Sequence, residues 1–591
     1  MPSVQRLLDE RVAAAMRAAF PEAADLPAIV VLAQDPRFGD YQANGAMALA
    51  KRLKRKPHEV AEAVLARLDV SDLAERPEIA GPGFINIRLR QDWVSRELGR
   101  ANPDERLGVP HAEKPETVVL DYSAPNLAKE MHVGHLRSTI IGDALVRMLD
   151  FAGHRVIRQN HVGDWGTQFG MLLAEMEAQK VFIRESGTTQ PLQAAYPDIG
   201  DLGTLYRQAK EHGDKNPEIK DEWRQIVVDL QRGDKQALWL WGLLRMISMQ
   251  HCNRVYHKLG VKLTDNDIRG ESAYNDDLPK VVEELRAKGL LTESEGAQCV
   301  FLDGFVAKDG PPLPLIVQKS DEGFLYATTD LAAIRYRVGE LHANRILYVV
   351  DARQSLHFQM LFACARKAGF APPDVAPVHV AFGTMMGPDG RPFKTREGGT
   401  VKLMDLLDEA ERRAYELVSA KSPDLPETEK RDIAHKVGIG AVKYADLAQS
   451  RTSDYVFSWD KMLSLDGNTA PYMQYAYARV RSIFRKGGHE AEGHRGDAAP
   501  IPVDAPAELA LAKMILRFPE ALDRTLEDYR PNVLAAYLYD LAQAFTAFYD
   551  ACPVIQSQGP TRANRLKLCD LTARVIARGL GLLGIETAER M

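Results

Sequence analysis

Two histidines flank a short Val-Gly pair in the stretch SAPNLAKEMHVGHLRS, which contains His132, Gly134 and His135. A β-rich run precedes them and a run with helical spacing follows, so they fall where a helix should begin. A helix N-terminus offers free N–H groups and partial positive charge, and therefore attracts phosphate. Imidazoles there can donate hydrogen bonds to a pentavalent phosphorus centre, and glycine lets a flat ligand approach the backbone. The three residues indicate a nucleotide site.

Four residues of this kind also occur by chance at a helix start, so the neighbouring elements matter. The sequence predicts a strand at 117–123, a helix at 137–153 and a second strand at 155–166. This order is a βαβ unit, the building block of a parallel sheet that binds nucleotides at its carboxyl edge. A metal site is disfavoured, because no carboxylate or third histidine accompanies the pair at ligand spacing.

The chain of 591 residues is too long for one hydrophobic core. Strand-like runs return at PLIVQ, RILYVVD and PVHVAFG after a polar stretch at 185–235, which indicates that the sheet resumes after an insertion. From about residue 405 onward the pattern is almost entirely helical. We therefore expect an α/β fold with an N-terminal α/β domain (1–110), a Rossmann-like parallel-sheet catalytic domain (111–405, insertion at about 180–260) and an all-helical C-terminal bundle (406–591).

The composition is that of an ordinary soluble protein, with 45% hydrophobic and 26% charged residues. No apolar run is long enough to span a membrane, and the charged N-terminus lacks a signal core, so we expect a cytoplasmic protein. The five cysteines are scattered without a CxxC pair, which argues against disulfides and zinc. A net charge of −6 argues weakly against a general nucleic-acid coat but does not exclude a nucleic-acid enzyme.

The fifty residues from Asp121 to Gly170 resemble the catalytic core of the arginine–tRNA ligase family, which are class I aminoacyl-tRNA synthetases. In that class the tetrapeptide "HIGH" stands where HVGH stands here, and SAPNLAK and NHVGDWGTQFG look specific to the arginine enzymes. The resemblance covers nearly the whole chain and is weakest at 180–235 and 485–510. It implies that the helical domain binds the anticodon and that the N-terminal domain contacts the D-loop side of the tRNA elbow.

A class I synthetase also needs a second loop, the "KMSKS" element, and the candidate here is MMGPDGRPFKTREGGTVKL at 385–403. Composition alone would make this a plain surface loop. The resemblance gives Phe393, Lys394 and Arg396 to the ATP site, although Thr395 stands where the second lysine of the motif should be. It implies that Lys129, three residues before HVGH, takes the place of that lysine. Which of Lys129, Lys394 and Arg396 dominates at the triphosphate stays open.

Selective binding of a guanidinium group needs a fixed carboxylate, because arginine offers five donors in a planar fork. Tyr326 and Asp330 lie four residues apart in GFLYATTDLAAIRYR, on one side of a helical turn. By sequence alone, an aspartate at a helix start is usually a cap. The resemblance implies that both meet the arginine side chain, that Gln354 completes the pocket, and that His135 also lies against the substrate. It assigns the α-amino and carboxylate ends to Asp121 and Asn126, and it adds Ser123 to the residues that bind arginine.

Aromatic and basic residues share a helix face near the C-terminus, where Tyr472, Tyr475 and Arg479 follow at i, i+3 and i+7. A core stripe is the usual explanation for such aromatics, whereas the arginines favour an RNA platform. The resemblance implies the platform. The residues it assigns to tRNA are Phe38, Gln42, Asn44, Tyr472, Tyr475, Arg479, Arg481, Tyr549 and Met591.

The resemblance implies an enzyme that activates L-arginine with ATP and transfers it to the 3′-terminal ribose of tRNA(Arg). Mg²⁺ would enter with ATP, with no tightly bound cofactor or zinc, and we expect a monomer. Three alternatives remain at this stage. A cysteine-specific synthetase would need zinc ligands, a small-molecule adenylyltransferase would not need the helical domain, and a non-catalytic tRNA-binding paralogue would not need His132, Gly134, His135 and Asp330.

Overall fold

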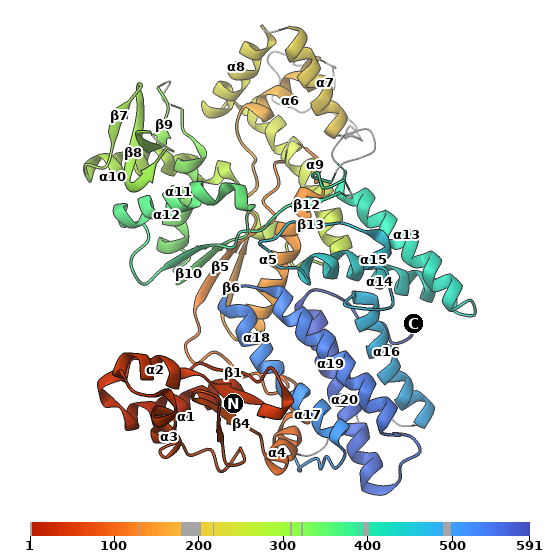
Figure 1. Ribbon diagram of the computed structural model, residues 1–591. Coiled ribbons are helices and arrows are strands. Elements are labelled where there is room, and N and C mark those ends of the chain that lie inside the picture. Colours follow the sequence, from red (N-terminus) through yellow and green to blue (C-terminus); the bar gives the residue numbers. More distant parts are fainter. Residues whose placement is uncertain are drawn as a thin grey trace. The chain divides into compact units, whose positions relative to one another are not determined.

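In the computed structural model of the chain, two neighbouring strands of a parallel sheet precede and follow the histidine stretch (Figure 1). The structure describes residues 3–127, 129–178, 202–216, 218–307, 310–320, 323–387, 389–393, 401–488 and 498–591. They divide into two compact units. One comprises Glu113–Ala414 and Ala445–Asp460, and the other Met1–Ala112, Tyr415–Tyr444 and Lys461–Met591. The expected domain limits at 110 and 405 stay a prediction.

The parallel sheet has the order β11-β10-β5-β6. Its strands are β5 (Thr117–Asp121), β6 (Arg155–Gln159), β10 (Arg345–Tyr348) and β11 (Ala376–His379). In register, Asp121 pairs with both Tyr348 and Gln159, so the carboxyl ends of three strands form one edge. Ligands of parallel sheets bind outside this edge. The predicted α/β catalytic fold is confirmed.

Helices cover the sheet and form the core with it. The helices beside the sheet are α5 (Gly134–Phe151), α11 (Tyr326–Gly339) and α12 (Ser355–Ala368). Leu331 of α11, Leu361 of α12 and Ile346 of β10 are fully buried in one hydrophobic cluster. The expected insertion contains α7 (Leu202–Lys215), α8 (Ile219–Gln231) and α9 (Lys235–Leu259), and α6 (Thr167–Ala178) precedes it. Helices α6, α7 and α8 pack side by side at one end of this unit (Figure 1).

One expected strand of the parallel sheet lies elsewhere. The run PLIVQ belongs to β9 (Pro312–Gln318), which pairs antiparallel with β8 (Ala297–Val306), itself paired with β7 (Thr292–Ser294) beside α10 (Leu278–Ala287). The expectation that PLIVQ continues the main sheet is therefore wrong. Its side chains alternate between buried and exposed, as in a sheet with one solvated face. A parallel strand covered on both faces would be buried throughout.

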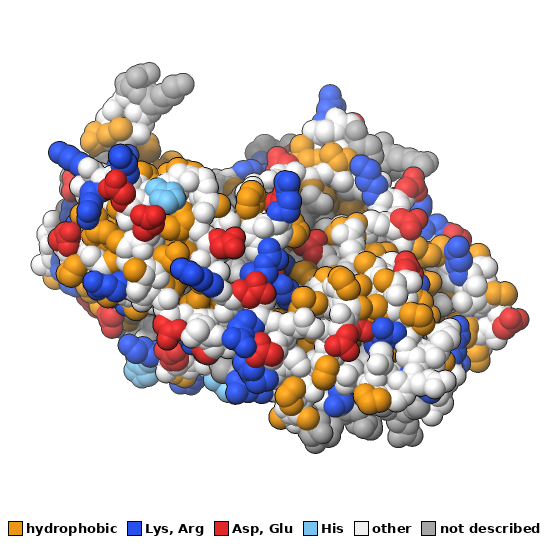
Figure 2. Space-filling model, turned by 60° about the horizontal axis from the view of Figure 1, so that its bottom comes forward, with side chains coloured by type: hydrophobic (Ala, Val, Ile, Leu, Met, Phe, Trp, Pro, Cys, Tyr) orange, Lys and Arg blue, Asp and Glu red, His pale blue; other side chains and the backbone are white. Residues whose placement is uncertain are grey.

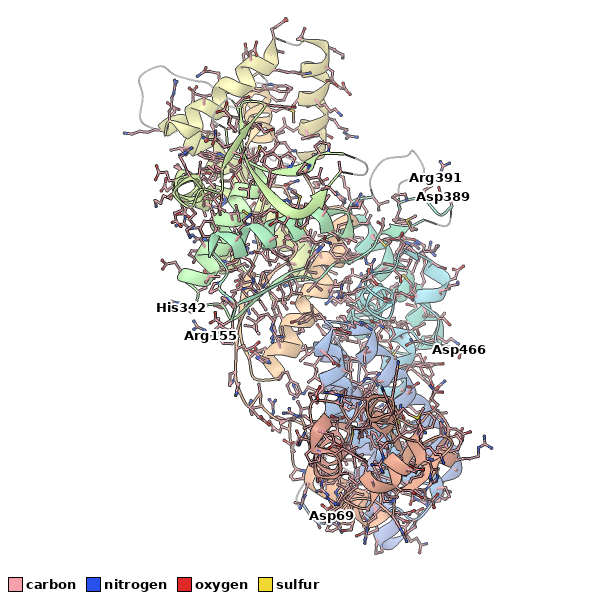
Figure 3. All side chains as sticks on the ribbon, turned by 60° about the vertical axis from the view of Figure 1, so that its left-hand side comes forward. Asp69, Arg155, His342, Asp389, Arg391 and Asp466 are labelled. Atoms are coloured by element: carbon pink, nitrogen blue, oxygen red, sulfur yellow. The ribbon has the colours of Figure 1, made fainter. Side chains whose placement is uncertain are left out.

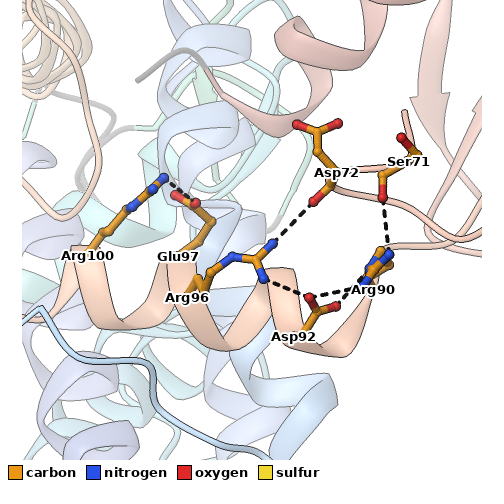
Figure 4. Close-up of polar contacts among 7 residues, drawn as sticks. All are labelled: Ser71, Asp72, Arg90, Asp92, Arg96, Glu97 and Arg100. Atoms are coloured by element: carbon orange, nitrogen blue, oxygen red, sulfur yellow. Dashed lines mark hydrogen bonds and ion pairs between the residues drawn. The ribbon is translucent and has the colours of Figure 1, made fainter. Parts of the chain in front are cut away.

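The N-terminal residues form a small α/β structure. Its antiparallel sheet has the order β1 (Val30–Leu32), β2 (Tyr41–Ala43), β4 (Phe84–Ile87) and β3 (Glu78–Ala80), packed with α1 (Val4–Ala19), α2 (Gly45–Leu53) and α3 (Pro57–Leu65). Helix α4 (Gln91–Ala101) follows. Asp92 accepts hydrogen bonds from Arg90 at 2.8 Å and Arg96 at 2.7 Å, while Arg96 reaches the Asp72 carbonyl (Figure 4). These exposed ion pairs hold the start of α4, but they add little to the free energy of unfolding.

The same unit contains the C-terminal helices. They are α14 (Glu427–Leu447), α16 (Ala470–Gly487), α17 (Pro506–Leu516), α18 (Phe518–Glu527), α19 (Pro531–Ala551) and α20 (Gly559–Leu582), with α13 (Leu403–Lys421) and α15 (Trp459–Met462) near the unit boundary. Of these, α17 and α18 contact the N-terminal residues. Buried Tyr41 donates to Glu520 at 2.9 Å, and Lys513 pairs with Asp40 at 2.7 Å. No periodicity in the sequence predicts this contact.

Lys, Arg, Asp and Glu side chains are interspersed over the face in Figure 2, without a continuous field of one sign. This distribution agrees with the small net charge of −6. Within the described residues, no helix is both long and apolar enough to cross a membrane. The same ranges hold no group of three or more His, Cys, Asp and Glu side chains arranged for a metal, and all five cysteines are free and buried.

Candidate functional site

Backbone N–H groups fix the tautomers of the two signature histidines. His132 Nδ1 accepts a hydrogen bond from the Gly134 N–H at 3.0 Å, and His135 Nδ1 accepts one from the His132 N–H at 3.1 Å. The ring centroids lie 4.1 Å apart. A neutral imidazole that accepts at Nδ1 carries its proton on Nε2. Each ring therefore keeps an Nε2–H donor for a ligand.

Both imidazoles are neutral near pH 7. Burial, with a smaller effect of His132, lowers the pKa of His135 to about 3. Burial also lowers the pKa of His132, and the positive charge of Lys129 lowers it further. The pair thus offers dipolar hydrogen-bond donors rather than two cations.

Gly134 is required by the fold of the signature itself. A Cβ at this position would lie 2.7 Å from Cε1 of His132, because that ring folds back over the start of α5. With any other residue here, the His132 ring would have to move. The glycine therefore allows the histidine conformation, in addition to any approach of a flat ligand.

Helix α5 is anchored directly behind the histidines. Arg137, two residues after His135, is almost fully buried and pairs with Asp446 at 3.0 Å. It also donates to the Ser453 carbonyl at 3.1 Å. Burial raises the pKa of Asp446, and the Arg137 charge opposes that shift. The pair holds the first turn of α5 in place.

The signature is joined to the chain that follows the second loop. The His132 backbone forms an antiparallel bridge with Lys402, supported by hydrogen bonds from Val133 N to Val401 O (3.1 Å) and from Leu403 N to Met131 O (3.0 Å). The predicted Lys394 and Arg396 lie outside the described residues. On their N-terminal side, Phe393 N donates to Met385 O at 3.1 Å.

That second segment also carries β12 (Met385–Met386), which pairs with β13 (Tyr455–Val456), and the Phe393 ring lies 5.0 Å from that of Phe457. Asp389 and Arg391 project outward from it (Figure 3).

The first turn of α11 carries the predicted arginine-side-chain residues. Tyr326 is 71% exposed at the helix start. Asp330 Oδ2 lies 2.7 Å from Nε2 of His357, and His161 Nε2 lies 4.0 Å from Oδ1. The side chain of Gln354 is exposed one turn before His357, at the end of a short 3-10 helix (Ala352–Gln354). His357 thus orients the aspartate and His161 lies near it, and neither histidine was predicted from the sequence.

A second carboxyl, Glu271, was also missed. It begins the 3-10 helix Glu271–Asp277, and burial, Asp164 and Asp330 together raise its pKa to about 8. Burial and then the charge of Glu271 raise the pKa of Tyr326. A perturbed carboxyl close to Asp330 marks a place suited to a cation. Nothing in the residue spacing around Glu271 distinguishes it in the sequence.

The residues predicted for the α-amino and carboxylate ends differ in their surroundings. Asp121 Oδ2 accepts from the buried guanidinium of Arg337 at 2.7 Å, and that guanidinium also donates to Gln159 at 2.6 Å. Asn126 is exposed and forms a bridge with Gly163, where a Cβ would lie 2.1 Å from its Oδ1. Asn126 is thus open to a ligand, whereas Asp121 has one oxygen already bound.

Ser123 belongs to a buried network. Its Oγ lies 2.8 Å from the Tyr256 hydroxyl and accepts from Thr139 at 2.9 Å. Ser123 (φ +70°) and Ala124 (φ +43°) are both in the left-handed region, an uncommon pair of non-glycine residues. Asn160 Oδ1 accepts from the Ala124 N–H at 3.0 Å. Strain of this kind persists where the surroundings hold it, and here it turns the chain at the sheet edge.

The predicted anticodon residues are at the surface. Tyr475 is 46% exposed, and Tyr472 and Arg479 are half-buried. None of the three is fully buried, so they do not form a stripe of core residues. The Arg479 guanidinium lies 4.4 Å from the ring centroid of Tyr549. Arg481 points elsewhere and pairs with Glu589 at 2.8 Å. The terminal residue Met591 is half-buried.

Three further residues were predicted to meet the tRNA elbow. Phe38 is 44% exposed in the short 3-10 helix Pro36–Phe38. Gln42 donates to Asn86 at 2.9 Å within the sheet. Asn44 precedes α2, and its Oδ1 is buried without a hydrogen-bond partner among the described residues. Phe38 is therefore the most accessible of the three.

Comparison with known proteins relates all three parts of the chain to one family. Family models match at 6–89 (arginyl tRNA synthetase N terminal domain), 101–459 (tRNA synthetases class I (R), catalytic domain) and 473–591 (DALR anticodon binding domain). Arginine–tRNA ligases of Hahella chejuensis and Cellvibrio japonicus are 55% and 54% identical over the full length of both chains.

Two solved structures agree with this assignment. Arginyl-tRNA synthetase of Plasmodium falciparum matches with a TM-score of 0.86 at 30% identity, and that of Thermus thermophilus with 0.82 at 27%; each match covers both chains completely. The chain therefore belongs to the arginine–tRNA ligase family of class I aminoacyl-tRNA synthetases.

Proposed function

We propose that this chain activates L-arginine with Mg-ATP and transfers the arginyl group to the 3′-terminal ribose of tRNA(Arg). The arginine carboxylate attacks the α-phosphorus in line, which gives arginyl-adenylate and pyrophosphate. The terminal ribose 2′-hydroxyl then attacks the adenylate carbonyl and releases AMP. The observation that carries the proposal is the pair of neutral Nε2–H donors at the start of α5, bridged to residues 401–403.

The histidines act on charge that appears during activation. As the carboxylate adds, negative charge grows on the α-phosphate oxygens, and preorganised donors stabilise that state more than the substrate. His132 and His135 present such donors without carrying charge themselves. Lys129 adds a cation beside His132, while Phe393, Lys394 and Arg396 are proposed to close the ATP site from the second loop.

The acidic pocket selects the side chain. Asp330, held by His357, is proposed to pair with the guanidinium, with Glu271 as a second carboxylate and Tyr326 beside them. Gln354 completes the pocket. Lysine cannot form the planar fork and citrulline lacks the charge, so either would leave the carboxylates badly satisfied. Asn126, Ser123 and the second oxygen of Asp121 are proposed to serve the α-amino and carboxylate ends.

An ATP–pyrophosphate exchange assay with each amino acid, with and without tRNA, tests the proposal. We expect exchange with arginine alone among the amino acids. Exchange with a different amino acid would contradict arginine as the substrate. Exchange without any amino acid would favour a small-molecule adenylyltransferase. Binding of tRNA without any exchange or charging would favour a non-catalytic paralogue.

We propose that the protein acts in the cytoplasm, because its substrates are those of translation. We also propose that it is a monomer, since all the site residues named above belong to one chain.

Arginine binding should depend on pH through Glu271. Its pKa of about 8 leaves the carboxyl largely protonated at pH 7. A guanidinium favours the ionised form, so binding releases this proton and becomes tighter as pH rises from 6 to 8. We expect the arginine Kd to fall by up to about tenfold per pH unit and to level off above pH 8. Calorimetry in two buffers of different ionisation enthalpy counts the released proton.

Glu271→Gln separates this effect from others. The variant should bind arginine more weakly at pH 8.5, and its Kd should be nearly independent of pH. Glu340→Gln, an exposed glutamate at the far end of α11, is the control and should keep the parental slope. A parental slope in Glu271→Gln as well would remove this carboxyl from the pocket.

Alanine at Tyr472 or Tyr475 should weaken tRNA binding. One base–aromatic stack is worth about 1–3 kcal/mol, so Kd should rise about 5- to 150-fold while Tm stays nearly parental. The control is Tyr477→Phe in the same helix. It removes the hydroxyl that donates a hydrogen bond to Glu589 and should leave the tRNA Kd unchanged. Changing the anticodon bases as well should give less than additive losses. Strictly additive losses would mean that the tyrosines do not contact those bases.

A further inference from the structure

The ammonium group of Lys129 lies over an aromatic ring of the insertion. Lys129 Nζ is 4.1 Å from the ring centroid of Tyr206, in the first half of α7. Both side chains are half-buried. A cation over the face of a tyrosine is attracted by the negative face of the ring. Lysine otherwise has four flexible bonds, so this contact restricts where its charge resides.

The same charge acts on the signature. The positive charge of the Lys129 ammonium contributes to lowering the pKa of His132, three residues further along the chain. The ammonium of Lys129 thus contacts the Tyr206 ring, and its charge acts on His132. A polyphosphate bound at the signature would attract this positive charge.

Helix α7 is a firm support for the ring. On its other face, Leu205 and Ala209 are buried, and Nδ1 of His212 lies 2.8 Å from the carboxylate of Glu175 in α6. A Cβ on Gly213 would lie 2.0 Å from the Trp223 ring of α8, so α7 and α8 pack closely. The three helices therefore hold Tyr206 at a fixed place beside the signature.

We propose that Tyr206 is a positioning residue for nucleotidyl transfer, which fixes the Lys129 ammonium for the triphosphate of ATP. The inference rests on the proposed function, because it requires Lys129 to act on that triphosphate. It gives the insertion a part in the chemical step. Tyr206 itself touches neither substrate nor reacting atom, and acts only through the lysine.

A double-mutant cycle in the full chain tests the proposal. The variants are Tyr206→Ala, Lys129→Ala and the pair, each assayed by ATP–pyrophosphate exchange with arginine and tRNA. Tyr206→Ala should lower kcat about 3- to 30-fold, the range expected for loss of one cation–π contact. In the Lys129→Ala background the same change should lower it less than about twofold. The arginine KM and tRNA Kd should not move in either background.

Two further variants exclude a structural effect. Tyr206→Phe keeps the ring and should restore kcat to within about twofold of the parent. Lys210→Ala removes an exposed lysine one turn along α7 and should behave like the parent. A Lys129→Ala variant with reduced but measurable activity, in which Tyr206→Ala is fully additive, would overturn the positioning role alone. A fully active Lys129→Ala would overturn the role of Lys129 and this inference together, leaving arginine activation itself intact.

Discussion

Asp330→Asn should bind arginine about 30- to 5,000-fold more weakly than the parent, while the KM for ATP changes little. Removing one member of a buried charge pair costs about 2–5 kcal/mol, because the partner charge is left uncompensated. In the free protein the Asp330 carboxylate already lies 2.7 Å from His357, so its position is set before arginine arrives. An amide there presents donors to donors. Arginine titration and the arginine KM in the exchange assay measure the loss.

The structure supplies the controls for this variant. Asp330→Asn also weakens the contact with His357, so Tm must be measured beside Kd. His357→Ala separates the two effects, because it keeps the carboxylate and removes only its support. It should cost less than Asp330→Asn. If His357→Ala costs as much, or if Asp330→Asn leaves the arginine KM unchanged, the guanidinium binds elsewhere.

The sequence predicted what depends on local spacing. HVGH between a strand and a helix placed His132 and His135 correctly at the start of α5, because β-rich and helical periodicities mark both borders. The parallel sheet followed from the same patterns. The prediction that PLIVQ continues the parallel sheet was wrong. A short apolar run does not distinguish a buried parallel strand from a strand of an antiparallel sheet with one solvated face.

The partners of the site residues could not be predicted in this way. Arg337 binds Asp121 from the far end of α11, and Tyr206 reaches Lys129 from the insertion. Both are pairs of residues distant in the chain, which register, helix packing and burial bring together. Glu271 is distinctive only through its neighbours, because burial and two carboxylates raise its pKa. Such properties belong to the folded environment and leave no mark in residue spacing.

The two halves of the site also use charge in opposite ways. At the nucleotide end, burial keeps two imidazoles neutral, so they add donors without attracting the arginine carboxylate into a fixed ion pair. At the side-chain end, Glu271 lies near Asp330 and can add a second negative charge by releasing its proton when a cation enters. A ligand with a guanidinium at one end and a carboxylate at the other is oriented by this contrast. Reversed binding would leave the acidic pocket facing a like charge.

His135→Ala should lower the rate of adenylate formation about 100- to 1,000-fold with little change in tRNA binding. It removes a preorganised donor, and loss of one such donor costs about 3–4 kcal/mol of transition-state stabilisation. His132→Ala removes the second donor and should act similarly, although it also frees the space above Gly134. Exchange and single-turnover assays measure both losses, with Tm as the check on folding.

The tautomer sharpens this expectation. Because Nδ1 of His135 accepts from the His132 N–H, only its Nε2–H faces the ligand. A glutamine amide nitrogen can take the place of Nε2, whereas an asparagine nitrogen overlays Nδ1. His135→Gln should therefore recover part of the rate and His135→Asn should not. With the pKa of His135 at about 3, the parental rate should also show no loss from its protonation between pH 6 and 8. Equal rates for the two amides, or a rate that falls with an imidazole pKa of about 6.5, would mean that His135 acts through its charge rather than as a neutral donor.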